Sequence, residues 1–328
     1  MPRQPGDLAI PATMMAAVID KYGGPSALRL RELPTPEPTR DQILIAIQTA
    51  GVGSWDAQMR DGEWSPSGRR GFPRVLGVDG SGIVVAKGAR VRRFRIGDRV
   101  WAYDFERAGF YAQYVAVDAD NAGHVPKLMS LRDAGAAAVT GLTALQGVVD
   151  TAETRRGETM LILGGTGAVG TLAIQFARWR GARVIATATG RRAANLARKL
   201  GAHAVVDARA RDAVDELSAV SPDGIDVVLA LAGGPSLERL LDSVPKGGRI
   251  VYPNGVEPVP RKRPGVRVKS YDATVGAAEF ARLARASDAT RLRVPIAGVY
   301  PLSQAARSHR RLKDSVLGRL ALGVRRGD

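Results

Sequence analysis

The stretch "LILGGTGAVGTLAIQFARWRGARVIAT", residues 161–187, decides the fold of this chain. It begins with an apolar run that ends at a cluster of glycines. An Ala- and Ile-rich segment follows, and then a second apolar run. This succession predicts a strand, a tight turn, a helix and a second strand, the unit from which helix-covered parallel sheets are built. Gly165, Gly167 and Gly170 have the G-x-G-x-x-G spacing, which is informative only in such a context.

The glycine spacing predicts that this turn binds the pyrophosphate of a dinucleotide. Gly165 would allow the tight turn, and Gly167 would let the backbone approach the phosphates with no Cβ in the way. Gly170 would let the helix pack close to the strand. The helix N-terminus then offers free N–H groups and a partial positive charge to the phosphates. The alternative is an ordinary strand-to-helix turn, which the complete strand–helix–strand context disfavours.

The end of the second strand indicates which dinucleotide to expect. Residues 183–192 read RVIATATGRR and include no Asp or Glu, the residues that usually meet the ribose 2′-hydroxyl of NAD. The hydroxyl of Thr189 and the guanidinium groups of Arg191 and Arg192 suit a 2′-phosphate instead, because arginine matches phosphate geometry. The sequence therefore predicts NADPH. The alternative is that both arginines are solvated residues at the start of a helix.

Two kinds of pattern divide the chain. From residue 126 to 275, strand and helix patterns alternate, which predicts a Rossmann domain with a doubly wound parallel sheet. Residues 1–125 show short β-type runs separated by glycine and proline, as in antiparallel β-rich domains. Residues 276–328 are most simply placed back in that first domain. The expected fold class is α/β, with a β-rich domain (1–125 and 276–328) and a Rossmann domain (126–275).

The composition excludes several kinds of site. The 328 residues include no cysteine and three histidines that are far apart in sequence, so we expect no disulfide, no thiol nucleophile and no metal site. The net charge is +16, but aromatic residues make up only 5% of the chain, too few for an obvious base-stacking platform. A basic enzyme with an anionic cofactor is therefore favoured, and no nucleic acid is expected. The alternative is an NADPH-binding regulatory or nucleic-acid-associated protein with little catalysis.

No stretch of the chain reads as a membrane span or as an export signal. The apolar runs are broken by Gly and Thr, well short of about 20 lipid-facing residues. The first residues, "MPRQPGDLAIPAT", contain no apolar core of a signal peptide. The expectation is a cytoplasmic protein that does not bind membranes.

Motifs spread from Met15 to Val324 resemble those of a known family. They read "AAVIDKYGGPSALRLRELPTPEP", "GVDGSGIVVAKGARVRRFRIGDRVWA", "AAAVTGLTALQGV", "ETMLILGGTGAVGTLAIQFAR" and "VYPLSQAARSHRRLKDSVLGRLAL". Together they resemble the medium-chain dehydrogenase/reductase superfamily, and most closely its zinc-free quinone oxidoreductase branch. The resemblance implies a GroES-like catalytic domain beside the Rossmann domain. It also implies a homodimer, with the strand near "VRVKSY" as a candidate interface.

The departures from the family's zinc-dependent members constrain the chemistry. Gly53 and Val78 stand where those members carry a zinc-binding Cys and His. Without that Lewis acid, reduction of a simple ketone loses several kcal/mol of charge stabilisation, and no Tyr-x-x-x-Lys pair is present. A quinone or another α,β-unsaturated carbonyl delocalises the charge itself, so the expected function is NADPH-dependent hydride transfer to such an acceptor. An alcohol dehydrogenase with another metal is a third interpretation, for which the sequence supplies no ligands.

The resemblance also implies individual contacts. Thr189 matches the residue that meets the 2′-phosphate, while the lysine common in members falls on Ala193. The remaining cofactor contacts would be Thr166, Ala168 and Val169 in the loop, Thr140 near the nicotinamide ribose, and two groups after strands: Leu231, Ala232 and Gly233, and Pro253, Asn254 and Gly255. Asp56 and Trp64 would line the substrate pocket. The alternatives are that Asp56 binds Arg60 across one helical turn and that Trp64 is a core residue.

Overall fold

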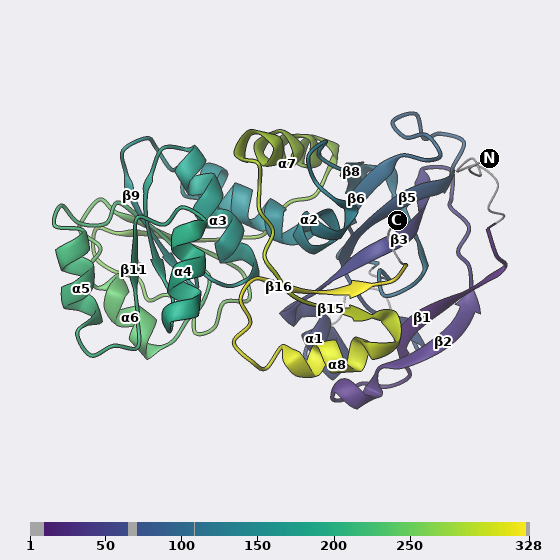
Figure 1. Cartoon of the computed structure of the whole chain (residues 1–328), viewed down its shortest axis with the longest axis horizontal. Coiled ribbons are helices and arrows are strands. Elements are labelled where there is room, and N and C mark those ends of the chain that lie inside the picture. Colours follow the sequence, from purple (N-terminus) through teal and green to yellow (C-terminus); the bar gives the residue numbers. More distant parts are fainter. Residues whose placement is uncertain (1–9, 65–70, 108, 326–328) are drawn as a thin grey trace. The chain divides into compact units, whose positions relative to one another are not determined.

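The computed structural model folds as two compact units (Figure 1). It describes residues 10–64, 71–107 and 109–325. The first unit comprises the described residues up to Val139, Val275–Asp288 and those from Ile296 onward, and the second comprises Thr140–Thr274 and Ala289–Pro295. Sequence patterns placed the first boundary at residue 126, before helix α2 (Leu131–Gln146), whereas the division falls inside that helix. The first half of α2 is tied to the first unit, since the Ser81 hydroxyl donates to the Leu131 carbonyl.

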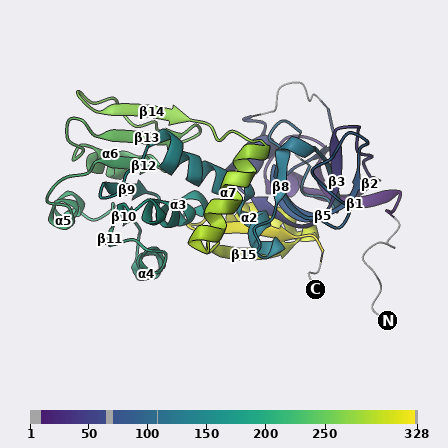
Figure 2. The ribbon, with the colours of Figure 1, turned by 90° about the horizontal axis from the view of Figure 1, so that it is seen from above.

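The second unit is built on a six-stranded parallel sheet in the order β11-β10-β9-β12-β13-β14, which Figure 2 shows in succession. Its strands are β9 (Thr159–Leu163), β10 (Arg183–Thr187), β11 (Ala204–Val206), β12 (Val227–Ala230), β13 (Arg249–Pro253) and β14 (Arg267–Tyr271). The order reverses between β9 and β12, which is the topological switch point beside which doubly wound sheets bind dinucleotides. The predicted Rossmann fold is confirmed.

Helices connect these strands in the alternation that the sequence predicts. They are α3 (Ala168–Trp179), α4 (Arg191–Lys199), α5 (Ala213–Val220) and α6 (Pro235–Leu241). The central strands β9 and β12 are runs of mostly buried apolar residues, as expected where helices cover both faces of a parallel sheet. Leu161 and Val228 from the strands share one core with Leu217 of α5 and Leu240 of α6. This core fixes the carboxyl ends of the strands, where the predicted cofactor residues lie.

The first unit is β-rich. A three-stranded sheet has the order β2-β1-β4, and a larger sheet has the order β15-β16-β3-β5-β6-β8, with β7 also paired to β3. The strands are β1 (Thr13–Ile19), β2 (Arg29–Pro34), β3 (Gln42–Val52), β4 (Arg74–Val75), β5 (Asp79–Lys87), β6 (Arg99–Tyr103), β7 (Tyr114–Asp118), β8 (Ala122–His124), β15 (Ile296–Pro301) and β16 (Arg319–Gly323). The helices α1 (Ser54–Asp61), α8 (Ala305–Arg311) and most of α7 (Ala277–Thr290) lie in this unit, together with the first half of α2. This architecture confirms the expected β-rich domain.

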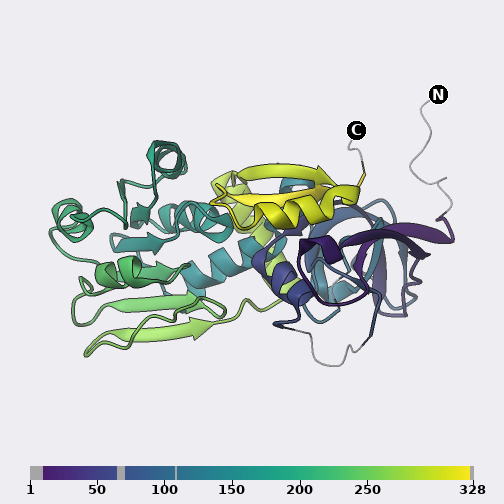
Figure 3. The same ribbon diagram turned by 90° about the horizontal axis from the view of Figure 1, so that it is seen from below.

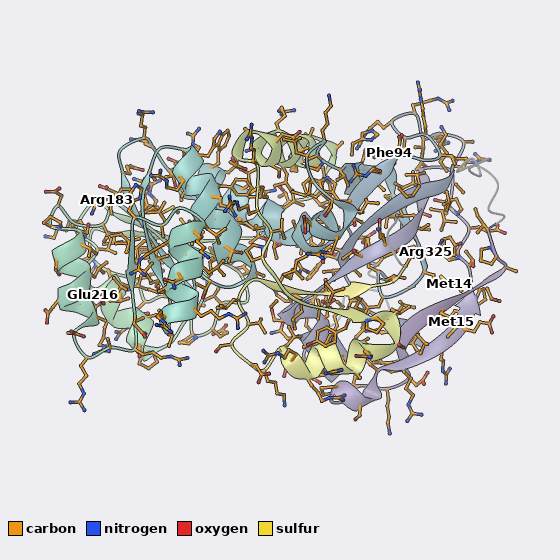
Figure 4. All side chains as sticks on the ribbon, viewed as in Figure 1. Met14, Met15, Phe94, Arg183, Glu216 and Arg325 are labelled. Atoms are coloured by element: carbon orange, nitrogen blue, oxygen red, sulfur yellow. The ribbon has the colours of Figure 1, made fainter. Side chains whose placement is uncertain are left out.

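The C-terminal segment completes the larger sheet. Strand β16 pairs antiparallel with β3, with Leu320 opposite Val52, and Figure 3 shows the yellow β15, β16 and α8 beside the purple and blue N-terminal strands. Met14 of β1, which is labelled in Figure 4, belongs to a small core that also includes Tyr114 of β7. The guanidinium of Arg325 lies 4.4 Å from the centre of the Tyr114 ring. Residues from both ends of the chain therefore hold the first unit together.

No helix in the described part of the chain is long and apolar enough to cross a membrane.

Candidate functional site

The glycine turn joins β9 to α3. Gly164 has a φ of 77°, a left-handed conformation that glycine adopts at no steric penalty. Its N–H donates to Oγ1 of Thr187 at 2.9 Å, so the end of β10 fixes the turn. The sequence placed the tight turn at Gly165, but the left-handed residue is Gly164. A Cβ on Gly165 would lie 2.8 Å from Cβ of Ala186, so Gly165 is needed for close packing against β10.

The other two glycines of the motif differ in what surrounds them. A Cβ on Gly170 would lie 2.2 Å from the carbonyl oxygen of Gly164, so the helix-to-turn packing itself requires glycine there. A Cβ on Gly167 would meet that same oxygen at 3.5 Å, an ordinary contact. Gly167 caps α3, whose first N–H groups have no partner within the helix. The turn therefore leaves room and donors for a phosphate beside Gly167.

Polar groups gather where β10 and β11 end. Thr189, Arg191 and Arg192 are exposed, the arginines in the first turn of α4, which contains no acidic residue. Cations at a helix N-terminus oppose the helix dipole by about 0.3–1 kcal/mol each, so an anion bound there would relieve them. The Thr189 hydroxyl donates to Oδ1 of Asp207 at 3.2 Å. Asp207 was not predicted as a site residue, since it follows β11 and only the strand order brings it beside Thr189.

The remaining cofactor candidates lie at the ends of β12 and β13, or on α2. The Leu231 N–H donates to the Leu163 carbonyl at 3.0 Å, which continues the pairing of β12 with β9 up to the glycine turn. Asn254 donates to the Asp272 carboxylate at 2.7 Å. A Cβ on Gly233 would lie 2.4 Å from the carbonyl oxygen of Pro258, so the fold itself requires glycine there.

The parallel sheet brings most of these candidates to one edge. The glycine turn, Thr189, the group from Leu231 to Gly233 and the group from Pro253 to Gly255 all follow carboxyl ends of neighbouring strands. Thr140 is 7% exposed on α2 and lies at no strand end. This edge therefore presents a continuous row of backbone and side-chain groups.

In the first unit, Asp56 is fully buried rather than facing solvent. Its Oδ2 accepts the N–H of Gly53 at 2.8 Å. Asp56 is the third residue of α1 and Gly53 is the N-cap, so this hydrogen bond stabilises the start of the helix. Burial raises the pKa of Asp56 from 3.8 to about 7; the Gly53 N–H and the charge of Arg319 oppose this rise, while Asp79 adds to it. The Asp56 carboxyl is thus a buried group that titrates near neutral pH.

Arg60 does not bind Asp56, so that sequence alternative is wrong. Its Nη2 lies 2.6 Å from Oδ2 of Asp61, and its Nη1 lies 2.8 Å from Nδ1 of His309. Burial, with the charge of Arg60, lowers the pKa of His309 to about 3, so its ring is neutral at physiological pH. Because arginine only donates, Nδ1 accepts, and Nε2–H donates to the Tyr111 hydroxyl at 3.1 Å. The Tyr111 hydroxyl in turn interacts with Asp56.

A buried ion pair lies next to this chain of hydrogen bonds. Arg319 Nη2 donates to Oδ1 of Asp79 at 2.6 Å, and Oδ2 of Asp79 accepts the Val139 N–H at 3.0 Å. Burial raises the pKa of Asp79, and the charge of Arg319 opposes the rise. A Cβ on Gly53 would lie 3.8 Å from Nη2 of Arg319. Gly51 is still tighter, since a Cβ there would lie within 2.6 Å of both members of the ion pair.

The two positions expected to lack zinc ligands lie in this region. Gly53 precedes α1, and Val78, which is 2% exposed, precedes β5. Glycine has no side chain and valine has no donor atom, so neither residue offers a side-chain ligand to a metal. Among the described residues, no group of three or more His, Cys, Asp or Glu side chains could hold a metal ion.

Trp64 belongs to a half-buried aromatic cluster. Its ring centre lies 4.1 Å from that of Phe105 and 5.8 Å from that of Trp55. Trp55 and Phe105 meet edge to face at 5.5 Å. Of these three residues only Trp64 was predicted as a site residue, because no local sequence pattern places Phe105 beside it. Flat apolar rings with partly exposed faces are suited to contact a planar conjugated molecule.

Comparisons with known proteins agree with this architecture. The family described as alcohol dehydrogenase GroES-like domain matches residues 39–127, and the one described as zinc-binding dehydrogenase matches residues 168–260. A quinone oxidoreductase of Sus scrofa is 31% identical over 310 residues, which cover 90% of this chain and 93% of that protein.

Solved structures agree as well. One described as an NAD-dependent alcohol dehydrogenase has a TM-score of 0.87 and 30% identity, covering 95% of this chain and 100% of that one. The Escherichia coli quinone oxidoreductase complexed with NADPH has a TM-score of 0.83 and 26% identity, with the same coverage.

Proposed function

Because the chain belongs to the medium-chain dehydrogenase/reductase superfamily, we propose that it is an NADPH-dependent, zinc-independent oxidoreductase that transfers hydride to a quinone or another α,β-unsaturated carbonyl. The observation that carries the proposal is the glycine turn. It lies at the switch point of a 3-2-1-4-5-6 parallel sheet, and a free helix N-terminus follows it. The names of the quinone oxidoreductase relatives support the acceptor class.

The residues at the sheet edge fit a dinucleotide. The first N–H groups of α3 and the open space at Gly167 would hold the pyrophosphate. Thr189, Arg191 and Arg192 would hold the 2′-phosphate, and the uncompensated cations at the start of α4 support that assignment. The reduced nicotinamide supplies the hydride. Leu231 and Pro253 lie further along the same edge, where the dinucleotide would continue.

The residues of the first unit would shape and position the acceptor. Trp55, Trp64 and Phe105 would provide an apolar wall for a planar ring. Asp56 would act as a positioning residue, because its buried carboxyl fixes the Gly53 N–H at the start of α1. Hydride addition to a conjugated carbonyl leaves negative charge delocalised onto oxygen, and one proton from solvent then completes the two-electron reduction. Such an acceptor needs less electrostatic help than a simple ketone.

A panel of acceptors tests this proposal. Oxidation of NADPH is followed with quinones, enals, enones and simple ketones, with and without a chelator. We expect turnover with the conjugated acceptors only, and no effect of the chelator. The double variant Arg191→Ala with Arg192→Ala should weaken NADPH binding about tenfold or more, since a charge-assisted hydrogen bond contributes about 1.5–3 kcal/mol. Arg198→Ala, at the opposite end of α4, is the matched control and should bind NADPH as the wild type does.

Two other results would contradict the proposal. Turnover of simple ketones that the chelator abolishes would indicate a metal-dependent alcohol dehydrogenase. A salt-sensitive gel shift with nucleic acid, and no NADPH oxidation with any acceptor, would favour the regulatory alternative.

We also propose that the protein forms a homodimer that pairs through β14, the edge strand of the parallel sheet. Sedimentation analysis would detect such a dimer.

A further inference from the structure

A carboxylate stands beside the hydroxyl proposed to bind the 2′-phosphate. Asp207 follows β11, and its Oδ1 accepts the Thr189 hydroxyl at 3.2 Å. The N–H of Ala188 donates to the Val206 carbonyl at 3.1 Å, so the ends of β10 and β11 are fixed to each other immediately before these two residues. The acid missing from the end of β10 is therefore replaced, in space, by one from the neighbouring strand.

The Asp207 carboxylate is held in place from its own side too. Its Oδ1 also accepts the N–H of Arg209 at 3.0 Å, a side-chain turn that fixes the carboxylate relative to the backbone. Its carbonyl accepts the N–H of Ala210 at 2.9 Å. Oδ2 has no hydrogen-bond partner among the described residues, and the side chain is half-buried. Oδ1 therefore accepts hydrogen bonds from the protein, and Oδ2 remains available to accept one from a ligand.

We propose that Asp207 is a specificity-determining residue that favours NADH and opposes NADPH, and so reduces the preference for NADPH that Thr189 and the neighbouring arginines provide. This inference rests on the proposed function. The free oxygen of Asp207 can accept a hydrogen bond from a ribose 2′-hydroxyl, as the acid of an NAD site does. A 2′-phosphate placed on Thr189 would instead bring its negative charges close to that carboxylate.

The surrounding charges act in the opposite direction. Arg191 and Arg192 follow Thr189 in the first turn of α4, and Arg209 follows Asp207. All three are exposed, and none forms an ion pair within the described ranges. Repulsion between two unit charges about 5 Å apart weakens binding about fourfold in bulk water, and about a hundredfold or more at the lower effective dielectric near a protein surface. This range includes the gain expected from one arginine, so Asp207 offsets about one of these arginines and reduces the preference for NADPH.

The test is the ratio of the dissociation constants of NADPH and NADH, measured by titration of nicotinamide fluorescence with the full chain. Asp207→Asn is the first variant, because the amide oxygen can still accept from Thr189 and Arg209 while the charge is removed. Asp207→Ser is the second. Asp215→Asn, an exposed acid on α5, removes the same charge from the same unit and is the control. Thermal melts confirm that each variant is folded.

We expect Asp207→Asn to tighten NADPH binding about tenfold, to leave NADH binding equal or weaker, and so to shift the ratio at least about tenfold. Two results would overturn the inference while leaving the proposed function intact: a ratio within about twofold of the wild type in both Asp207 variants, or an equal shift in Asp215→Asn. If the wild type binds neither dinucleotide, the proposed function itself fails.

Discussion

Replacing the buried acid Asp56 with asparagine should make the stability of the first unit less dependent on pH. The folded protein holds the pKa of Asp56 at about 7, against 3.8 ordinarily, mainly through burial. The folded state therefore binds this proton more tightly than the unfolded state does. Protonation of the Asp56 carboxyl therefore stabilises the folded state. This stabilisation is full below pH 3.8 and is lost as the pH rises towards about 7. An asparagine imitates the protonated carboxyl, and its oxygen can still accept the Gly53 N–H.

The size of the effect follows from linkage. One pKa unit corresponds to about 1.4 kcal/mol, so ionising Asp56 in the folded state lowers the free energy of unfolding by about 4 kcal/mol above neutral pH. About 3 kcal/mol of this is lost between pH 5 and pH 8. The difference in unfolding free energy between Asp56→Asn and the wild type should therefore grow by about 3 kcal/mol over that interval, in favour of the variant.

Denaturant unfolding at pH 5 and pH 8, followed by tryptophan fluorescence, measures this difference. Trp55, Trp64 and Trp101 lie in the first unit and only Trp179 in the second, so the signal reports chiefly the unit that contains Asp56. Glu37→Gln, at an exposed acid of the first unit, controls for a simple change in net charge. If the difference between Asp56→Asn and the wild type were the same at both pH values, the assignment of a buried neutral carboxyl would be wrong.

The glycine turn and the buried ion pair give further predictions. Gly167→Ala should melt near the wild-type temperature yet bind NADPH at least about tenfold more weakly, because its Cβ fits the protein and fills the phosphate space. Gly170→Ala should lower the stability by about 1–3 kcal/mol even without cofactor, since backbone must move. Arg319→Met should lower the free energy of unfolding by about 3–5 kcal/mol, because Asp79 is left buried without its partner. Arg90→Ala breaks the exposed ion pair between Arg90 and Asp41. In the same denaturant titration it should change the free energy of unfolding by about 1 kcal/mol or less.

The features predicted correctly from the sequence are those that local patterns encode. The apolar runs of β9 and β10 and the glycine spacing between them require only neighbouring residues, and both lie where the pattern places them. The sequence pattern changes at residue 126, shortly before α2 begins at Leu131. The contacts of the chain pass from one unit to the other after Val139, within α2. Composition reports the start of a helix, but only packing reports which unit each half joins.

The contacts that the sequence did not reveal join residues distant in sequence. Arg60 meets His309 from 249 positions away, and Arg319 meets Asp79 from 240 positions away. No periodicity signals either pair, because each depends on strand or helix neighbours that only the tertiary fold creates. The alternative that Asp56 binds Arg60 is wrong for the same reason, because the partners of Arg60 depend on the tertiary fold. Helical spacing allowed Arg60 as a partner, but the buried ring of His309 and the carboxylate of Asp61 hold the guanidinium elsewhere.

The same difference between local sequence patterns and contacts made by the tertiary fold applies to the proposed choice of dinucleotide. A rule based only on the residues that follow β10 gives NADPH, because they include a threonine hydroxyl and two arginines. Strand β11 lies beside β10, and its end adds a carboxylate within hydrogen-bond distance of the same hydroxyl. In the proposed complex, the ribose would lie beside two adjacent strand ends with opposite charges. If Asp207 acts as proposed, cofactor preference would depend on both strand ends, which a motif confined to one strand does not include.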